Sequence, residues 1–373
     1  MKVDFYKHNL GKEEKEALNK VVDSTFITTG PVTKTFEENF AEYLGAKYCI
    51  GVSSWTSGNL ITLKALGVGL GDEVITTPMS FIATSNTIIH TGAKPVFVDV
   101  EPETGNIDAK KIESAITEKT KAIIPVHLYG QMCDMKTIKE IAKKHNLFII
   151  EDAAHCVEGE RDGIKPGQLS DAAVFSFYAT KNITSGEGGA IITNNSELFE
   201  ILKKYRLHGM SKGAAERHTA IYQHWDMELL GYKCNMSDLQ ASLLEPQLKK
   251  IEDYLQARAN ICKQYENAFL NLKNVNMPTV LGDTKHARHL FTVWVDSSKR
   301  DKIIYKLQKN NLGVTVNYRA IHLLSYYIKT FGFNENSFPI AENIGDSTIT
   351  LPMYPKMTDL EVKYVIDVLK KSL

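Results

Sequence analysis

The sequence predicts an α/β fold: a large domain with a mainly parallel, mixed sheet flanked by helices, followed by a smaller α+β domain at the C-terminus. Three observations predict it. Short apolar runs alternate with amphipathic stretches through the first two thirds of the chain, as in a sheet covered by helices. A long polar segment then breaks this alternation. The chain has 373 residues, enough for two domains with apolar cores.

The elements of the large domain follow from this alternation. Amphipathic stretches predict helices over residues 57–66, 135–145 and 197–205. The apolar runs are short and are separated by turn residues, so we expect strands rather than buried helices. These runs cover residues 48–52, 73–77, 95–100, 122–127, 148–151, 172–177 and 190–193.

The domain boundary is expected after the polar segment 207–235, which carries His208, His218, His224 and Trp225. Loops of this length are more often functional than not. A capping box from Ser237 to Gln240 then opens a helical stretch that Pro246 should bend or interrupt. We therefore assign residues 1–236 to the large domain and 237–373 to the small one. The small domain should contain a strand at 290–295, a helix at 301–310, a strand at 313–318 and a final helix at 359–371.

Composition narrows the class of ligand. The 44 acidic and 44 basic residues balance, and no basic block stands out, so nucleic acid and anionic membrane are poor partners. No secretory signal or membrane-spanning apolar stretch is visible, which predicts a cytoplasmic protein with a small-molecule ligand. Neither a disulfide framework nor a metal site is expected from the dispersed, odd set of cysteines, Cys49, Cys133, Cys156, Cys234 and Cys262.

Lys181 is the strongest candidate for chemistry. It follows the apolar run 172–177 and precedes a glycine-rich turn, and Asp152 stands at the carboxyl end of the apolar run before that one. Ligands of open α/β sheets bind at the carboxyl ends of strands. An amine and a carboxylate at one edge suit a lysine that forms an imine, although each residue alone is more typical of a surface charge or a structural salt bridge.

Further candidates lie where other strands end. Segment 52–59 passes from a strand through small hydroxyl residues into a helix, whose N-terminus favours phosphate. Taken in isolation, this pattern is more typical of an ordinary Ser/Thr N-cap. Ser176 offers another hydroxyl, and Phe81 could stack on an aromatic ligand or belong to the core.

These motifs, in this order, resemble the DegT/DnrJ/EryC1/StrS family of sugar aminotransferases, which depend on pyridoxal 5'-phosphate (PLP) and have the aspartate aminotransferase fold (fold type I). The resemblance spans almost the whole chain. It rests on the segments 26–31, 71–75, 151–155, 180–189 and 351–355.

The resemblance implies a role for each residue of the cofactor site. Lys181 would hold PLP as an internal aldimine, Asp152 would pair with the pyridine nitrogen, and Phe81 would cover one face of the ring. His155 would lie near the ring oxygen. Thr56, Ser57 and Ser176 would bind the phosphate, and Asn235 would reach across from the second subunit of a homodimer with shared active sites.

The resemblance also implies that glutamate gives its amino group, through PLP and its pyridoxamine form, to a nucleotide-linked ketosugar. Segments 27–31 and 319–320 resemble aminotransferases acting at C4 of UDP-4-keto sugars, either a pentose or a 6-deoxy-N-acetylhexosamine. A C3 aminotransferase for a dTDP-3-keto-6-deoxyhexose remains an alternative, as does a non-catalytic PLP- or nucleotide-binding protein. An NAD enzyme is disfavoured because no G-x-G-x-x-G opens a helix. The expected substrate-binding residues are Thr29, Tyr178, Lys233, Tyr318, Arg319 and His322.

Several positions depart from the family pattern. His155 replaces a frequent glutamine, although histidine also occurs, and Ala320 replaces a frequent proline. Trp55 stands where a small residue is usual, and Tyr178 stands where many relatives have histidine. Both should lie close to the cofactor or the sugar.

Overall fold

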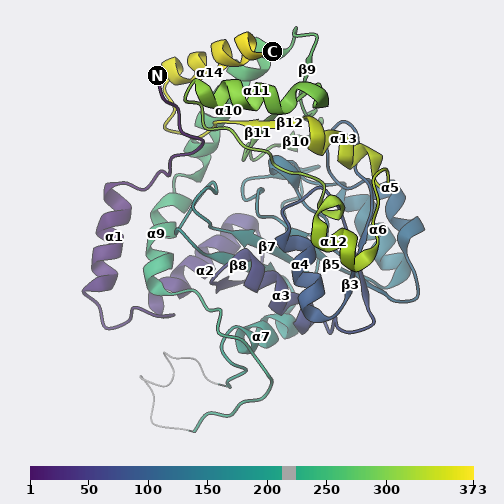
Figure 1. The fold of residues 1–373 in the computed structure, drawn as a ribbon. Coiled ribbons are helices and arrows are strands. Elements are labelled where there is room, and N and C mark those ends of the chain that lie inside the picture. Colours follow the sequence, from purple (N-terminus) through teal and green to yellow (C-terminus); the bar gives the residue numbers. More distant parts are fainter. Residues whose placement is uncertain (212–223) are drawn as a thin grey trace.

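The computed structural model describes residues 1–211 and 224–373. A seven-stranded mixed sheet forms the centre of the molecule, in the order β1-β8-β7-β5-β4-β2-β3 (Figure 1). Only β8 runs antiparallel to its neighbours; the other pairs are parallel. The strands are β1 (Tyr48–Val52), β2 (Glu73–Thr76), β3 (Lys94–Phe97), β4 (Thr120–Ile123), β5 (Phe148–Asp152), β7 (Ala172–Ser176) and β8 (Gly189–Thr193).

Helices cover both faces of this sheet, because alternate strand residues face opposite sides. One face packs on α3 (Trp55–Ala65), α4 (Ala83–Thr91) and α7 (Ser196–Tyr205). The other packs on α2 (Pro31–Leu44), α5 (Ala109–Ile112), α6 (Met135–His145) and α9 (Asp238–Leu248). The predicted α/β class is confirmed, and so is each of the seven central strands within a few residues at either end.

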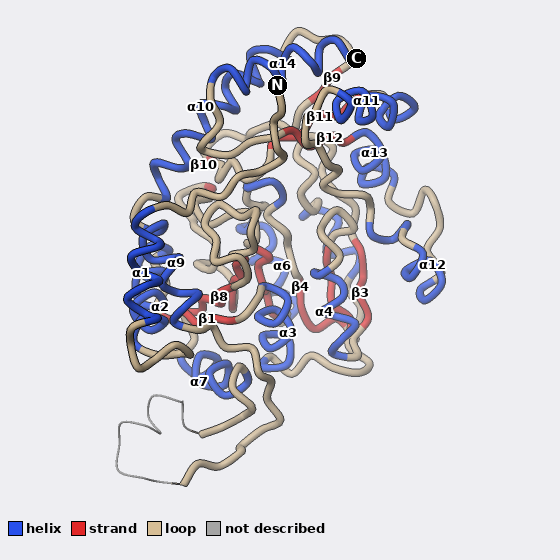
Figure 2. Tube along the Cα trace, turned by 60° about the vertical axis from the view of Figure 1, so that its left-hand side comes forward, coloured by secondary structure: helices blue, strands red, loops and turns tan. Residues whose placement is uncertain are grey.

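A smaller unit lies at one end of this three-layer body (Figures 1 and 2). Its antiparallel sheet, β12-β11-β9, packs against α10 (Ile251–Phe269), α11 (Ser297–Lys309) and α14 (Asp359–Ser372). The strands are β9 (Val275–Asn276), β11 (Phe291–Val295) and β12 (Thr348–Leu351). Two short helices, α12 (Ser325–Phe331) and α13 (Pro339–Ser347), lie between α11 and β12 in the chain. A separate pair, β6 (Glu160–Arg161) and β10 (Thr284–Lys285), joins the two units.

The division at residue 237 stays a prediction, and segments on each side of it pack with the opposite unit. Val3 belongs to the core of the C-terminal unit and bridges to Leu312. Leu244 of α9 belongs to the core beneath β7 and β8, and α1 (Lys12–Val22) packs beside α9. The start of the chain therefore lies on the small unit, while the first helix after the boundary lies on the large one.

One local expectation needs correction. The strand expected at residues 313–318 is wrong, since only an isolated bridge joins Thr315 to Thr350. The helical stretch that begins at Ser237 is interrupted near Pro246, as expected: α9 ends at Leu248 and α10 begins at Ile251. Proline removes a backbone donor, which favours the end of a helix close to it.

The polar segment 207–235 leaves the body as two arms (Figure 2). Antiparallel bridges join Leu207 to Lys233 and Met210 to Met227. Residues 212–223, including His218, lie outside the described residues. Within the described residues, no helix is long and apolar enough to cross a membrane. All five cysteines are described; each is buried and none is paired with another.

Candidate functional site

The candidate site lies at one edge of the central sheet, where β1, β5 and β7 all end. These strands run in the same direction, so Val52, Asp152 and Ser176 come together at that edge. A cavity of about 570 Å³ opens there. Of the residues predicted from sequence, it is lined by Thr56, Phe81, Asp152, His155, Ser176, Tyr178, Lys181 and Tyr318, together with Trp55.

Lys181 lies on the turn that joins β7 to β8. Its backbone N–H donates to the Tyr178 carbonyl at 2.9 Å, and Ser185 N–H closes the turn on the Phe177 carbonyl at 3.1 Å. Burial lowers the pKa of Lys181 to about 8, against the opposing attraction of the Asp152 carboxylate. About a tenth of this amine is therefore neutral, and nucleophilic, at pH 7, far more than for an ordinary lysine.

Asp152 is a buried carboxylate held by neutral donors. Thr84 Oγ1 donates to Oδ2 at 2.8 Å and the Ala154 N–H donates to Oδ1 at 3.2 Å. Burial raises the pKa of Asp152, and those hydrogen bonds and the Lys181 charge only partly offset it. A buried carboxylate needs a cationic partner, so a protonated ring nitrogen beside Asp152 would stabilise its charged form.

The N-terminus of α3 forms an anion cradle beside these two residues. Ser54 caps the helix, because its hydroxyl accepts a hydrogen bond from the Ser57 N–H at 3.1 Å. The first N–H groups of a helix point out of its N-terminus, and here that terminus, with Ser54, Trp55 and Thr56, forms part of the cavity wall. Thr56 and Ser176 both line the cavity. Ser57 does not line it, because its hydroxyl is held by Ser53 and Ser54.

Two glycines allow α3 to come this close to the sheet. A Cβ on Gly189 of β8 would stand 2.7 Å from the Ser54 carbonyl carbon and 2.8 Å from the Trp55 nitrogen. A Cβ on Gly58 of α3 would stand 3.0 Å from a methyl of Val174. The glycine-rich turn after Lys181 therefore has a packing reason: it lets the helix end reach the cavity.

His155 is a neutral side chain at the cavity wall. Its Nδ1 accepts the Tyr129 N–H at 3.3 Å, so the ring proton resides on Nε2, which faces the Tyr318 hydroxyl at 3.1 Å. Burial holds the pKa of His155 well below its usual range. Phe81 is exposed to the cavity, with its ring centroid 6.0 Å from that of Tyr318. An aromatic ring between Phe81 and the sheet edge would have apolar cover.

The departures from the family pattern now have positions. The Trp55 indole is buried in the core, where its N–H donates to the Val174 carbonyl at 3.1 Å, so the added bulk is absorbed beneath the cavity. Tyr178 is exposed and lines the cavity. Tyr178 is 46% exposed and Trp55 6%, so the Tyr178 ring is the more accessible of the two to a ligand.

The remaining predicted residues do not line the cavity. Lys233 Nζ donates a hydrogen bond to Asn235 Oδ1 at 2.5 Å, and Asn235 Nδ2 donates to the Thr29 hydroxyl. These three residues therefore form a separate cluster outside the cavity. Arg319 is exposed outside the cavity. His322 is fully buried and bonds Glu342 at 2.9 Å, which argues against its predicted contact with substrate.

Sequence reasoning missed several lining residues. Thr84 lies three residues after the predicted Phe81, and Asn317 lies next to the predicted Tyr318. A hydroxyl one helical turn from Phe81 was a usable signal. Phe5 gave no signal, because only the pairing of the N-terminus with residues 311–313 brings it to the cavity. The other lining residues that were not predicted are Ser54, Ser80, Ala83, Val126, Ala154, Thr180, Glu187, Gly188 and Thr315.

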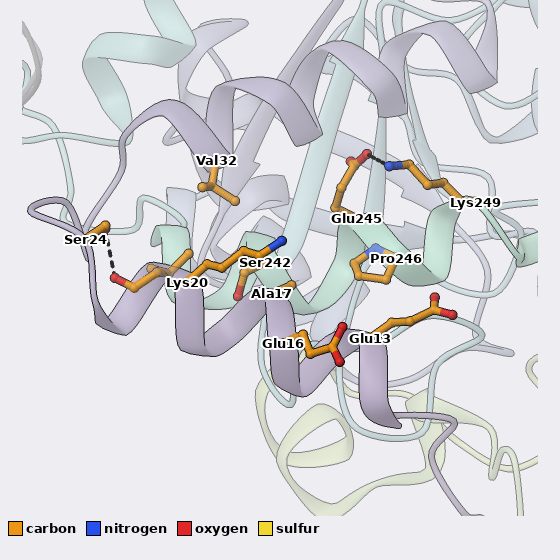
Figure 3. A pocket seen from close by; sticks show the side chains of 11 residues that line it. Glu13, Glu16, Ala17, Lys20, Ser24, Val32, Ser242, Glu245, Pro246 and Lys249 are labelled. Carbon is orange, nitrogen blue, oxygen red and sulfur yellow. Dashed lines mark hydrogen bonds and ion pairs between the residues drawn. The ribbon is translucent and has the colours of Figure 1, made fainter.

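A second hollow, of about 430 Å³, lies between α1 and α9 (Figure 3). Charged side chains of both signs surround an apolar floor, and Lys249 pairs with Glu245 at 3.3 Å. It contains no predicted site residue and no nucleophile beside a base. The cavity at the sheet edge is therefore the better candidate for chemistry.

Comparison with known proteins identifies the family of the chain. The sequence model of the DegT/DnrJ/EryC1/StrS aminotransferase family matches residues 8–370. The spore coat polysaccharide biosynthesis protein SpsC of Bacillus subtilis is 42% identical over 367 residues, covering 97% of this chain and 94% of that protein.

Two solved structures have almost the same fold. Spr1654 from Streptococcus pneumoniae, described as a sugar aminotransferase and solved in its PMP form, has a TM-score of 0.94 and 31% identity, covering 99% of this chain and 98% of that one. PseC from Helicobacter pylori, an aminotransferase involved in the biosynthesis of pseudoaminic acid, has a TM-score of 0.93 and 30% identity, covering 100% of this chain and 99% of that one.

Proposed function

Because the chain belongs to the DegT/DnrJ/EryC1/StrS aminotransferase family, we propose that it transfers an amino group from glutamate to C4 of a UDP-linked 4-ketosugar. The chain is a PLP-dependent sugar aminotransferase. The amino donor, the sugar, its nucleotide and the position of the new amine are the parts that we propose.

The observation that carries the proposal is the arrangement of Lys181, Asp152 and the N-terminus of α3 around one cavity. The residues present fit PLP: an amine of lowered pKa for its aldehyde, a buried carboxylate that needs a cation, and an anion cradle for its phosphate. Thr56 and Ser176 would bind the phosphate, Asp152 the pyridine nitrogen, and Phe81 would cover the ring. When bound, PLP supplies an electron-accepting ring, and the protein supplies position and charge.

Each of these residues has a task in the transfer. Lys181 would hold the aldehyde of the cofactor and, once its amine is free, would move a proton at the substrate carbon. Burial lowers the pKa of Lys181 in the cofactor-free chain to about 8, closer to neutral pH than that of an ordinary lysine. Asp152 would keep the ring nitrogen protonated, and His155, whose Nε2–H faces the Tyr318 hydroxyl, would lie near the ring oxygen.

The cavity lacks the cations that its proposed ligands need. Glutamate and a nucleotide diphosphate are both anionic, whereas the charged residues lining the described part of the cavity are Lys181, Asp152 and Glu187. Lys233 and Asn235 belong to the cluster with Thr29, outside this chain's own cavity. We therefore propose a homodimer in which this cluster serves the partner's site, close to the substrate diphosphate. We also propose that the enzyme works in the cytoplasm.

The choice of a UDP-4-ketosugar is supported by segments 27–31 and 319–320 and by the likeness to PseC. The test is to incubate the purified protein with glutamate and a panel of UDP-4-keto and dTDP-3-keto sugars, and to identify the aminated product by mass spectrometry and NMR. We expect amination at C4 of a UDP sugar, with loss of turnover in Lys181→Ala.

The panel also separates the alternatives. Amination only at C3 of a dTDP sugar would replace the proposed substrate and leave the reaction class intact. A Lys181-dependent absorbance band with no turnover on any sugar would indicate a PLP-binding protein without this activity.

A further inference from the structure

Asn182, next to Lys181, ties the lysine-bearing turn to two distant parts of the chain. Its Nδ2 donates to Glu158 Oε2 at 2.7 Å and to the Ala287 carbonyl at 3.1 Å. Since Nδ2 is the donor, Oδ1 accepts from His289 Nδ1 at 2.8 Å. The amide nitrogen and the amide oxygen of Asn182 are therefore both hydrogen-bonded. They connect Glu158, in the large unit, with the loop that leads into β11.

Glu158, which accepts a hydrogen bond from this amide, also forms a buried ion pair. Arg258 Nη2 contacts Glu158 Oε1 at 2.5 Å, and the two side chains are 2% and 0% exposed. The same Nη2 donates to the Ala287 carbonyl at 3.3 Å. Removing one partner of a buried pair is strongly destabilising, so Glu158 is a fixed acceptor for Asn182. A cavity of about 30 Å³ adjoins Lys181, Asn182 and Arg258, with room for about two waters around the guanidinium.

His289 carries the connection to the wall of the active site. Its ring centroid lies 4.4 Å from that of His155, and its backbone N–H donates to the Tyr129 carbonyl at 3.1 Å. The Tyr129 N–H is in turn the group that fixes the tautomer of His155. Burial holds the pKa of both histidines well below the usual range, so both rings are neutral and each has one N–H. That of His289 is on Nδ1, committed to Asn182.

We propose that Asn182 is a positioning residue that, supported by Glu158, Arg258 and His289, fixes the Lys181 turn relative to the His155 ring. Asp152, His155 and His289 interact electrostatically with Lys181. The cavities beside Lys181 are also lined by the charged or titratable side chains of Tyr6, Lys7, His8, Tyr178, Glu187, Arg258, Tyr318 and Tyr354. If the turn that carries Lys181 moved relative to these groups, both the position of the lysine amine and its electrostatic environment would change. The inference rests on the proposed role of Lys181 as the residue bound to PLP.

The test compares variants of the PLP-bound enzyme. Asn182→Ala should shift the pH midpoint of the visible absorbance of the Lys181–PLP linkage by about half a unit or more. It should also lower kcat by about tenfold or more with little change in the KM for the sugar, because the loss is one of alignment. Asn260→Ala, an exposed change on α10, is the control and should leave both values at wild type.

His289 provides an independent arm. His289→Asn keeps an N–H close to the original Nδ1 and should stay within about twofold of wild type, whereas His289→Ala should reproduce Asn182→Ala. The double variant Asn182→Ala with His289→Ala should be no worse than Asn182→Ala alone, because Asn182→Ala already removes the contact with His289.

Each outcome bears on the proposal. An unchanged midpoint and kcat in a folded Asn182→Ala, or additive losses in the double variant, would overturn it. If Asn182→Ala does not fold, the test is the comparison of the two His289 variants. A higher kcat in His289→Asn than in His289→Ala supports the proposal, and equal kcat values overturn it. If Lys181→Ala keeps the wild-type absorbance band, the proposed function itself fails, which is a different result.

Discussion

At the scale of single residues, the pKa of Lys181 controls how the enzyme acquires its cofactor. Burial lowers that pKa to about 8, and the Asp152 carboxylate opposes the decrease. Only the neutral amine attacks an aldehyde, so the rate at which PLP-free protein takes up PLP should rise about tenfold per pH unit below about pH 8 and level off above it. Stopped-flow absorbance across a pH series measures this rate.

Asp152→Asn is the companion variant. It removes the charge that raises the pKa of Lys181, so the midpoint of uptake should move to lower pH. Turnover should also fall by about 10²-fold or more, because an amide does not keep the ring nitrogen protonated. A wild-type midpoint near 10, the ordinary value for lysine, would contradict the burial argument.

Individual residues were predictable from sequence where a strand end placed them. Lys181, Asp152 and Ser176 follow apolar runs, and parallel strands bring such ends to one edge. His322 was not predictable, since its partner Glu342 is twenty residues away in the chain and no local pattern reveals that pair. Phe5 depends in the same way on a long-range pairing.

At the scale of elements, the approach of α3 to β8 is the contact that places the phosphate cradle. Gly189→Ala would put a Cβ 2.7 and 2.8 Å from backbone atoms of Ser54 and Trp55. Backbone cannot yield as a flexible side chain does, so we expect a loss of about 1–3 kcal/mol in the free energy of unfolding and weaker PLP binding. Thermal unfolding and PLP titration measure both.

Gly69→Ala is the matched control. A Cβ at Gly69 meets nothing within 4 Å, and its φ lies outside the range that disfavours other residues. Its stability and PLP affinity should equal those of the wild type. Wild-type PLP affinity in Gly189→Ala would show that the cradle tolerates displacement of the helix.

The elements themselves were predictable to the extent that local pattern decides them. Strands β1, β5 and β7 are apolar runs bounded by turns, and sheet burial on both faces explains why. The segment 313–318 has a similar pattern but forms no strand. There the Asn317 N–H donates to the Thr350 hydroxyl, and the Asn317 carbonyl accepts from the Tyr129 hydroxyl. These hydrogen bonds to side chains take the place of the backbone hydrogen bonds of a strand pair.

At the scale of the whole molecule, the balance of charge in the cavity supports the proposed homodimer. Lys181 is the cation among the described lining residues, while Lys233 and Asn235 stand together outside this chain's cavity. In the proposed homodimer, each site takes Lys181 from one subunit and Asn235 from the other. Asn235→Ala and Lys181→Ala should therefore each be inactive. In each site of the proposed homodimer, the two substitutions would remove residues that come from different subunits.

Mixing the two inactive variants tests this directly. Subunits that exchange at random give half heterodimers, each with one site carrying both substitutions and one carrying neither, so about a quarter of wild-type activity should return. The measurement is glutamate-dependent amination after co-expression or unfolding and refolding of the mixture. Lys181→Ala mixed with itself, treated identically, should recover nothing. If Asn235 served its own subunit's site, every heterodimer site would carry one of the two substitutions, and the mixture would stay inactive.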